Sequence, residues 1–130
     1  MFMTINQCQS GSLSIQDVFS DIPDNLPEEL FQTLINTSDV RIERIISRGH
    51  QTPPGEWYDQ DEDEWVMVIQ GAAELVFDDG RLPVRLGEGQ CLYLPAHCRH
   101  RVSWTLPGAN TIWLAVFFPP DSNDLSILPE

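Results

Sequence analysis

From residue 40 onward, the chain is a succession of short runs in which apolar and polar residues alternate. A period of two places successive side chains on opposite faces, which is typical of strands. Turn signals separate the runs, at Gly71, Asp79-Gly80, Gly87-Glu88-Gly89, Pro95 and Pro107-Gly108. Asp79-Gly80 between two alternating runs is a strong hairpin signal. Short strands at this spacing predict an all-β, antiparallel barrel or sandwich.

The stretch NLPEE at 25–29 has the features of a helix start. It offers a capping residue, a proline for the first turn, and two acids for the positive end of the helix dipole. Leu30, Leu34 and Ile35 would then share one helical face. The sequence therefore predicts one short N-terminal helix over about 27–36.

The length of 130 residues fits a single domain with one core. The change of pattern near residue 40 divides the chain into three parts. We expect an N-terminal arm with the short helix at 1–39, the barrel at 40–118 and a C-terminal tail at 119–130.

The charge balance excludes two classes of partner. The formal net charge is −13, and all seven basic side chains are arginines. A nucleic acid or an anionic membrane surface requires basic residues to neutralise phosphates, so neither is expected as a partner. The N-terminus has no basic region followed by an apolar stretch, which favours the cytoplasm. The three cysteines, Cys8, Cys91 and Cys98, are expected to be reduced thiols, with Cys91 buried.

Two stretches carry a recognisable motif spacing. Glu64 is followed by six residues and then Gly71; from Gly89, five residues lead to a proline and, five positions later, to His100. This spacing resembles the two-motif signature of the cupins, which are small antiparallel β-barrels of the jelly-roll type. WYDQDEDEW, LPAHCRHRVSW and TIWLAVFF are similar to a subgroup of short, single-domain bacterial cupins without a settled activity. The resemblance covers about 40–118 and implies a double-stranded antiparallel β-helix.

The chain departs from the cupin pattern at the metal ligands. The two histidines of the first motif would fall on Tyr58 and Gln60, or one residue earlier in each case, and none of these positions is histidine. The resemblance implies one divalent metal (Fe, Mn, Ni or Zn) held by Glu64 and His100, with Gln60 or Asp59 adding an oxygen. The alternative is a lost metal site, in which Glu64 and His100 hydrogen-bond to each other.

The acidic run DQDEDE at 59–64 cannot point in one direction if the backbone is extended. Alternation places its last glutamate inside the barrel, because the strand that follows is apolar on that side. It leaves Asp61 and Asp63 outside, where they are expected to be solvated or paired with Arg99 and Arg101.

Further residues are candidates for lining a pocket at the barrel mouth. Aromatic rings in the long loop before the acidic run offer a face for a ring or a sugar. If His100 points inward, Cys98, two positions before it, and Trp104, four positions after it, do so too. Trp104 should then fill the barrel. The candidates are Trp57, Tyr58, Asp59, His97, Cys98 and Trp104.

Three functions are compatible with these patterns. The first is a metal-dependent enzyme acting on a small polar metabolite. The second is a metal-free module that binds a sugar or another metabolite. The third is a structural homodimer, since cupins commonly dimerise and exposed strand edges invite pairing. The fold does not choose among them, and whether the protein is an enzyme stays open.

Overall fold

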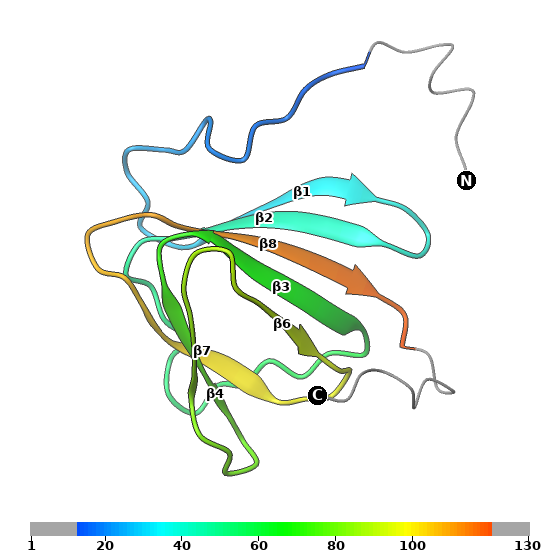
Figure 1. Cartoon of the computed structure of the whole chain (residues 1–130), viewed down its shortest axis with the longest axis vertical. Coiled ribbons are helices and arrows are strands. Elements are labelled where there is room, and N and C mark those ends of the chain that lie inside the picture. The colour runs from blue at the N-terminus through cyan, green and yellow to red at the C-terminus, as the bar shows by residue number, and fades with distance from the viewer. Residues whose placement is uncertain (1–12, 121–130) are drawn as a thin grey trace.

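The computed structural model describes residues 13–120, and the regular elements in this range are eight strands and no helix (Figure 1). Cys8 and most of the predicted C-terminal tail lie outside the described residues. The described range contains no helix that could cross a membrane. The strands are β1 (Leu30–Asn36), β2 (Arg41–Ser47), β3 (Asp63–Gln70), β4 (Ala73–Phe77), β5 (Val84–Leu86), β6 (Cys91–Leu94), β7 (His100–Thr105) and β8 (Thr111–Phe118).

The strands form two antiparallel sheets. The larger has the order β1-β2-β8-β3-β6, and the smaller has the order β5-β4-β7. The last strand, β8, pairs with both β2 and β3, so strands far apart in the sequence become neighbours. In Figure 1, β1 lies at the free edge of the larger sheet, on the side away from β4 and β7. The prediction of an all-β, antiparallel barrel is confirmed.

The hydrophobic core lies between the inner faces of the two sheets. Along β4 the burial alternates, with Ala73, Leu75 and Phe77 buried and the residues between them partly exposed, as the pleat requires. Burial of one large aliphatic side chain stabilises a fold by about 1.5–3 kcal/mol, so this cluster holds the sheets together. Its members are Val66, Val68, Ala73, Leu75, Phe77, Leu86, Leu94, Trp113, Ala115 and Phe117.

The predicted N-terminal helix is wrong, because its residues form strand β1. Leu30–Asn36 pairs with β2, with Leu30 opposite Ile46 and Phe31 opposite Ile45. A helix this short is marginal in water without tertiary support. The free edge of β2 offers a ladder of backbone hydrogen bonds instead, and this tertiary gain overrides the local helix signals. The folded sheet therefore begins before residue 40.

Two buried or half-buried arginines fix the segment that precedes β1. The side chain of Arg44 is buried and donates hydrogen bonds to the backbone carbonyls of Val18 and Ser20. Arg48 donates in the same way to the carbonyls of Pro23 and Asp24. These contacts hold the segment 18–24 against the larger sheet, so β1 begins from a fixed position.

A bulge in β7 reverses the direction of one predicted pocket residue. Leu75 pairs with Val102, but its neighbour Glu74 pairs with Trp104, so β7 carries one extra residue at Ser103. Trp104 therefore shares the outer face with Glu74, where the guanidinium of Arg85 lies 4.1 Å from its ring centroid. The prediction that Trp104 fills the barrel is wrong, because a bulge changes the side-chain period.

The thiol of Cys91 is also placed differently from the prediction. Cys91 and Cys98 are free cysteines, and Cys91 is exposed rather than buried. It begins β6, which is an edge strand of the larger sheet, so among residues 13–120 this strand has a paired neighbour on one side only.

Gly71 closes the turn between β3 and β4, and we predict that Gly71→Ala destabilises the fold by more than backbone strain alone. The backbone φ is +94°, and an added Cβ would lie 2.8 Å from the Cα of Thr111. Strain at such a φ costs about 1–3 kcal/mol, and the clash with the backbone of β8 adds to it. The free energy of unfolding in urea is the measurement.

Gly80→Ala is the matched control for this prediction. Its φ is +85°, but a Cβ there meets no atom within 4 Å. The Gly80→Ala variant should therefore lose only the part of the free energy of unfolding that comes from backbone strain. Equal losses in the two variants would contradict the close approach of Gly71 to β8.

Candidate ligand site in the barrel

A cavity of about 170 Å³ lies inside the barrel. This volume is below the roughly 300–1,000 Å³ of pockets for drug-sized ligands, so it suits a small metabolite. Its polar lining consists of Glu29, Arg41, Glu43, Tyr58, Gln60, Glu64 and His100. Its apolar lining consists of Phe31, Ile45, Val66, Leu75, Leu94, Val102, Trp113 and Phe117.

Glu64 is a buried carboxyl group at the start of β3. It is 8% exposed, and the side-chain amide of Gln60 donates a hydrogen bond to its Oε1 at 2.9 Å. Burial raises the pKa of Glu64 from its ordinary value of 4.5 to about 7, although the hydrogen bond from Gln60 opposes this rise. Near neutral pH, protonated and ionised forms are therefore both populated. The prediction that Glu64 lies inside the barrel agrees with this position.

His100 faces Glu64 from the first residue of β7. Its Nδ1 lies 2.8 Å from the carbonyl oxygen of Cys98, which can only accept, so Nδ1 carries the proton. Burial lowers the pKa of His100, so the ring is neutral at pH 7 and Nε2 is an acceptor. Nε2 lies 3.8 Å from Oε1 of Glu64. This distance is too long for a direct hydrogen bond.

Tyr58 closes the same side of the cavity. Its backbone forms a two-residue bridge with His100, and the two rings stack with centroids 5.5 Å apart. Burial, together with the charges of Glu29 and Glu64, raises the pKa of Tyr58, so its hydroxyl stays protonated. The phenol can therefore donate a hydrogen bond to a ligand in the cavity.

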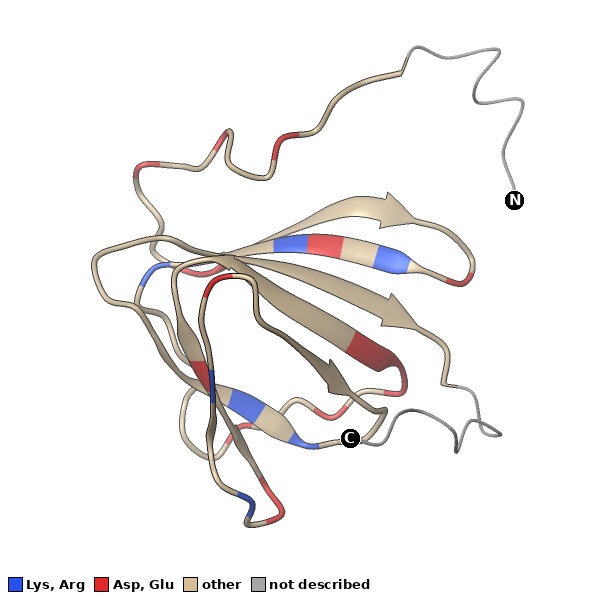
Figure 2. Ribbon diagram, in the orientation of Figure 1, with Lys and Arg blue, Asp and Glu red and all other residues tan. Residues whose placement is uncertain are grey.

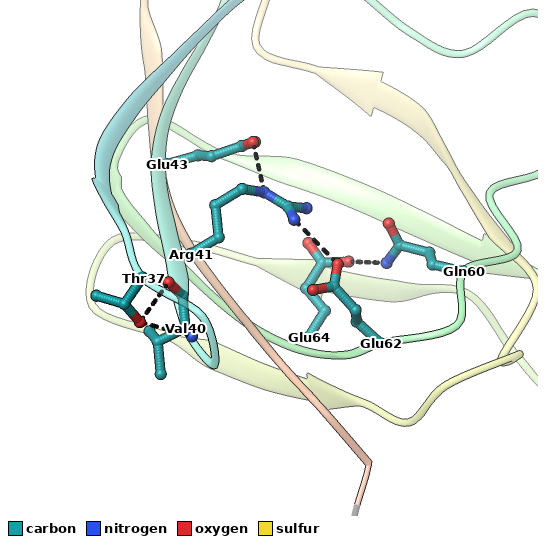
Figure 3. A network of polar contacts seen from close by, with 7 residues as sticks. All are labelled: Thr37, Val40, Arg41, Glu43, Gln60, Glu62 and Glu64. Carbon is teal, nitrogen blue, oxygen red and sulfur yellow. Dashed lines mark hydrogen bonds and ion pairs between the residues drawn. The ribbon is translucent and has the colours of Figure 1, made fainter. Parts of the chain in front are cut away.

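Arg41, in the cavity wall, binds two further carboxylates, of which Glu43 also lines the cavity and Glu62 does not (Figure 3). Its Nε donates to Glu43 at 3.0 Å, and its Nη1 donates to Glu62 at 3.1 Å. The guanidinium also lies 4.2 Å from the ring centroid of Phe117. Figure 3 shows the pair of Gln60 and Glu64 beside this network. Arg41 and Glu43 were missed in the sequence, although their two-residue spacing on one strand would have placed them on a common face.

Glu29 is a third polar residue that the sequence did not predict for this site, after Arg41 and Glu43. The hydroxyl of Ser47 donates to its Oε2 at 2.5 Å, and the same hydroxyl accepts a hydrogen bond from Nε1 of Trp113 at 3.1 Å. Ser47 is fully buried. The incorrect helix prediction had placed Glu29 in a first helical turn, and no local signal indicates its contact with β2.

Five of the six predicted pocket residues lie outside this cavity; Trp104, on the outer face of β7, is one of them. Trp57 sits between the guanidinium groups of Arg99 and Arg101, at 5.8 and 5.7 Å from its ring centroid, and lines a neighbouring hollow that also includes Tyr58. Cys98 packs against the core but lines a separate surface hollow. The alternation extended back from His100 fails at Cys98 because β7 begins only at His100.

His97 and Asp59 bond to each other at the surface. Nδ1 of His97 lies 2.9 Å from a carboxylate oxygen of Asp59, and its Nε2 lies 3.4 Å from one of Asp61. These carboxylates raise the pKa of His97. The backbone of His97 has a φ of +65°, so the turn directs this side chain along the surface rather than over the cavity.

Asp63 differs from the prediction of a solvated or arginine-paired group. It is buried and accepts hydrogen bonds from the hydroxyl of Tyr93 and the backbone N–H of Ala96, each at 2.8 Å. Arg99, its predicted partner, pairs with Asp78 at 2.6 Å. Asp63 thus anchors the turn before β7, which the alternation rule alone cannot indicate.

The polar groups at the cavity do not fit a tightly bound transition metal. Such ions need about three or four converging protein donors. Within residues 13–120, no group of three or more His, Cys, Asp or Glu side chains converges in this way. Glu64 and His100 supply one donor each, and Gln60 uses its amide to donate to Glu64. No chemical step at this site is therefore assigned to a metal, and elemental analysis of the purified protein checks the metal prediction.

The buried carboxyl of Glu64 predicts a stability that falls as pH rises. Its folded-state pKa of about 7 exceeds the ordinary 4.5, so the folded state binds more protons between these values. Stability from this group is complete below pH 4.5 and is lost as pH rises through 7. Glu64→Gln lacks this pH-dependent loss. The difference in free energy of unfolding between the variant and the wild type should therefore shift in favour of the variant by about 2 to 3 kcal/mol from pH 5 to pH 8.

Urea unfolding at several pH values measures this difference. Glu28→Gln is the control, because Glu28 is exposed and its replacement should leave the pH profile parallel to the wild type. A Glu64→Gln profile that also runs parallel would contradict a raised pKa at Glu64.

Comparison with known proteins agrees with the motif spacing. The model of the cupin domain family matches residues 45–117. A structure from Ralstonia eutropha JMP134, provisionally named a mannose-6-phosphate isomerase, is 45% identical, with a TM-score of 0.79. The match covers 82% of this chain and 99% of that one. No functionally curated protein matches the sequence.

Two more distant structures share the fold. One is a protein of unknown function from Streptococcus pyogenes, with 20% identity, a TM-score of 0.65, and coverage of 85% of this chain and 91% of that one. The other is an RmlC-like cupin with a double-stranded β-helix from Methanocaldococcus jannaschii, with 21% identity, a TM-score of 0.60, and coverage of 76% and 87%. The family match over residues 45–117 and the 45% identical relative show that this chain belongs to the cupin family.

Proposed function

We propose that this cupin binds a small sugar-type metabolite in the barrel cavity and that Glu64 exchanges a proton with the bound molecule. The observation that carries the proposal is the buried Glu64 carboxyl facing the neutral imidazole of His100 inside a cavity of metabolite size. A carboxyl group with a pKa near the working pH both accepts and donates protons efficiently.

The three polar groups at this end of the cavity have complementary roles in such a reaction. The carboxylate of Glu64 removes a proton from a carbon next to a carbonyl, and the electron pair of the C–H bond forms the C=C bond of an enediolate. The hydroxyl of Tyr58 donates a hydrogen bond to the enediolate oxygen. Glu64 returns this proton to the neighbouring carbon. Nε2 of His100 takes the proton of the hydroxyl group that becomes the new carbonyl and passes it to the oxygen of the former carbonyl, so both side chains end in their starting protonation states. Aldose and ketose interconvert in this way without an oxidant.

The name of the Ralstonia eutropha protein supports the sugar class but not a phosphorylated substrate for this chain. The cavity lining holds three glutamates and one arginine. That arginine, Arg41, is already bonded to Glu43 and Glu62. The red bands at the start of β3 and within β2 in Figure 2 mark part of this acidic lining. Because a phosphate would need a free cation or backbone donors, we propose an unphosphorylated ligand.

Deuterium exchange tests this proposal on unphosphorylated hexoses. We expect glucose, mannose or fructose to change the fluorescence of Trp113, which lines the cavity, and to exchange a carbon-bound proton in ²H₂O, followed by NMR. Glu64→Gln should slow this exchange by about 100-fold or more, since a positioned acid–base group contributes about 10²–10⁴. Glu28→Gln should exchange at the wild-type rate.

The two readouts separate the alternatives. Binding without exchange would make the protein a metal-free binding module. Neither binding nor exchange with any of the three hexoses would overturn the proposal.

A second candidate function is that of a structural homodimer joined through β1. This strand is an edge of the larger sheet. Two of its apolar side chains are largely uncovered, with Phe31 52% and Ile35 48% exposed. An uncapped edge with apolar side chains is a template for pairing with another strand, and pairing of two β1 edges forms a closed two-fold interface.

Light scattering at micromolar concentration tests the dimer. We expect twice the chain mass for the wild type and a monomer for Ile35→Asp, because a charge at a paired apolar edge opposes association. Leu82→Asp is the control, since Leu82 is 83% exposed on the β4–β5 connection. A monomeric wild type would remove this candidate.

A further inference from the structure

We infer that the ligand carries an ammonium group and that Glu29 is the residue that selects for this charge. The inference rests on the proposed function, because it concerns the same cavity. It names the chemical class of the ligand as a small hydroxylated amine, such as an amino sugar.

The charges at the cavity favour a cation. Three glutamates and one arginine line it, which gives a formal charge of 1 − 3 = −2 when all are ionised. Arg41 is bonded to Glu43 and Glu62, and the His100 ring is neutral. Glu29 belongs to none of the ion pairs within residues 13–120. Its negative charge is therefore left for a ligand.

A second, independent observation points to a hydrogen-bond donor on the ligand. The side chain of His100 is only 6% exposed. Its Nδ1 is bonded to the Cys98 carbonyl, but its Nε2 has no hydrogen-bond partner in the described part of the chain. A buried polar atom without a partner is costly and uncommon. An ammonium group has three N–H donors and no acceptor, so it suits the two acceptors that the ligand can reach here, Nε2 of His100 and the carboxylate of Glu29.

The position of Glu29 is fixed before any ligand binds. Ser47, fully buried on β2, donates to Glu29 and is itself held by the indole N–H of Trp113. Glu29, Tyr58 and Glu64 all line the same cavity. The aromatic rings of Tyr58 and Trp113 add faces that attract a cation.

Two matched series of ligands test the inference, each with a neutral, a cationic and an anionic member. The first is glycerol, 2-amino-1,3-propanediol and glycerol 3-phosphate. The second is glucose, glucosamine and glucose 6-phosphate. Calorimetric titration at about pH 7 should show, in at least one series, the amine bound about tenfold or more tightly than the neutral member. The phosphate should bind most weakly.

The outcomes separate this inference from the proposed function. If the neutral members bind as tightly as the amines, or if a phosphate binds most tightly, the charge selection is overturned while a sugar-type site stands. If none of the six compounds binds, the proposed binding function fails, and the inference fails with it.

Variants of Glu29 test the residue itself. Glu29→Gln keeps an oxygen for the Ser47 hydroxyl but removes the charge, so the preference for the amine should fall by about fivefold or more. Glu29→Asp restores the charge and should recover part of the preference. Glu28→Gln, at the exposed neighbouring position, should keep the full preference. A Glu29→Gln variant that is folded by circular dichroism and retains the preference would overturn the assignment of Glu29.

Discussion

The pairing of β8 with β2 on one side and β3 on the other sets the position of the cavity. Phe117 lies opposite Arg41 in β2 and opposite Glu64 in β3, so these three residues form one row across the sheet. Residues that are directly opposite share a face. A slip of one residue in either register would turn the charged groups outward and the apolar outer face inward. The site chemistry therefore depends on the backbone hydrogen bonds of a single central strand.

Burial of ionisable groups in the cavity lowers the free energy of unfolding, and the apolar core offsets this loss. Glu64 and His100 are almost fully buried, and burial disfavours the charged form of each. A carboxyl group without a cationic partner in such a place is uncommon for structure alone, whereas shifted groups are typical of functional sites. The apolar cluster beneath them, which includes Val66, Leu75 and Trp113, provides the compensating stability.

Strand interiors were predictable because alternation is a local property. The positions of Glu64 and Gln60 follow from the period of two, and the inward direction of His100 follows from the same rule within β7. The prediction fails where the period is interrupted. The bulge at Ser103 turns Trp104 outward, and the turn before His100 removes His97 from the cavity. Both irregularities depend on packing against other strands, which no local pattern contains.

The sequence by itself determined the fold class, the family and the inward direction of Glu64 and His100, because alternation, turn residues and motif spacing are local properties of one segment. Only the tertiary structure decided that the segment before β2 is a strand and that Glu29 enters the cavity. The physical reason is that Glu29 owes its place to a hydrogen bond from Ser47, which in turn is held by Trp113. These partners lie far apart along the chain and meet only when β1, β2 and β8 pair.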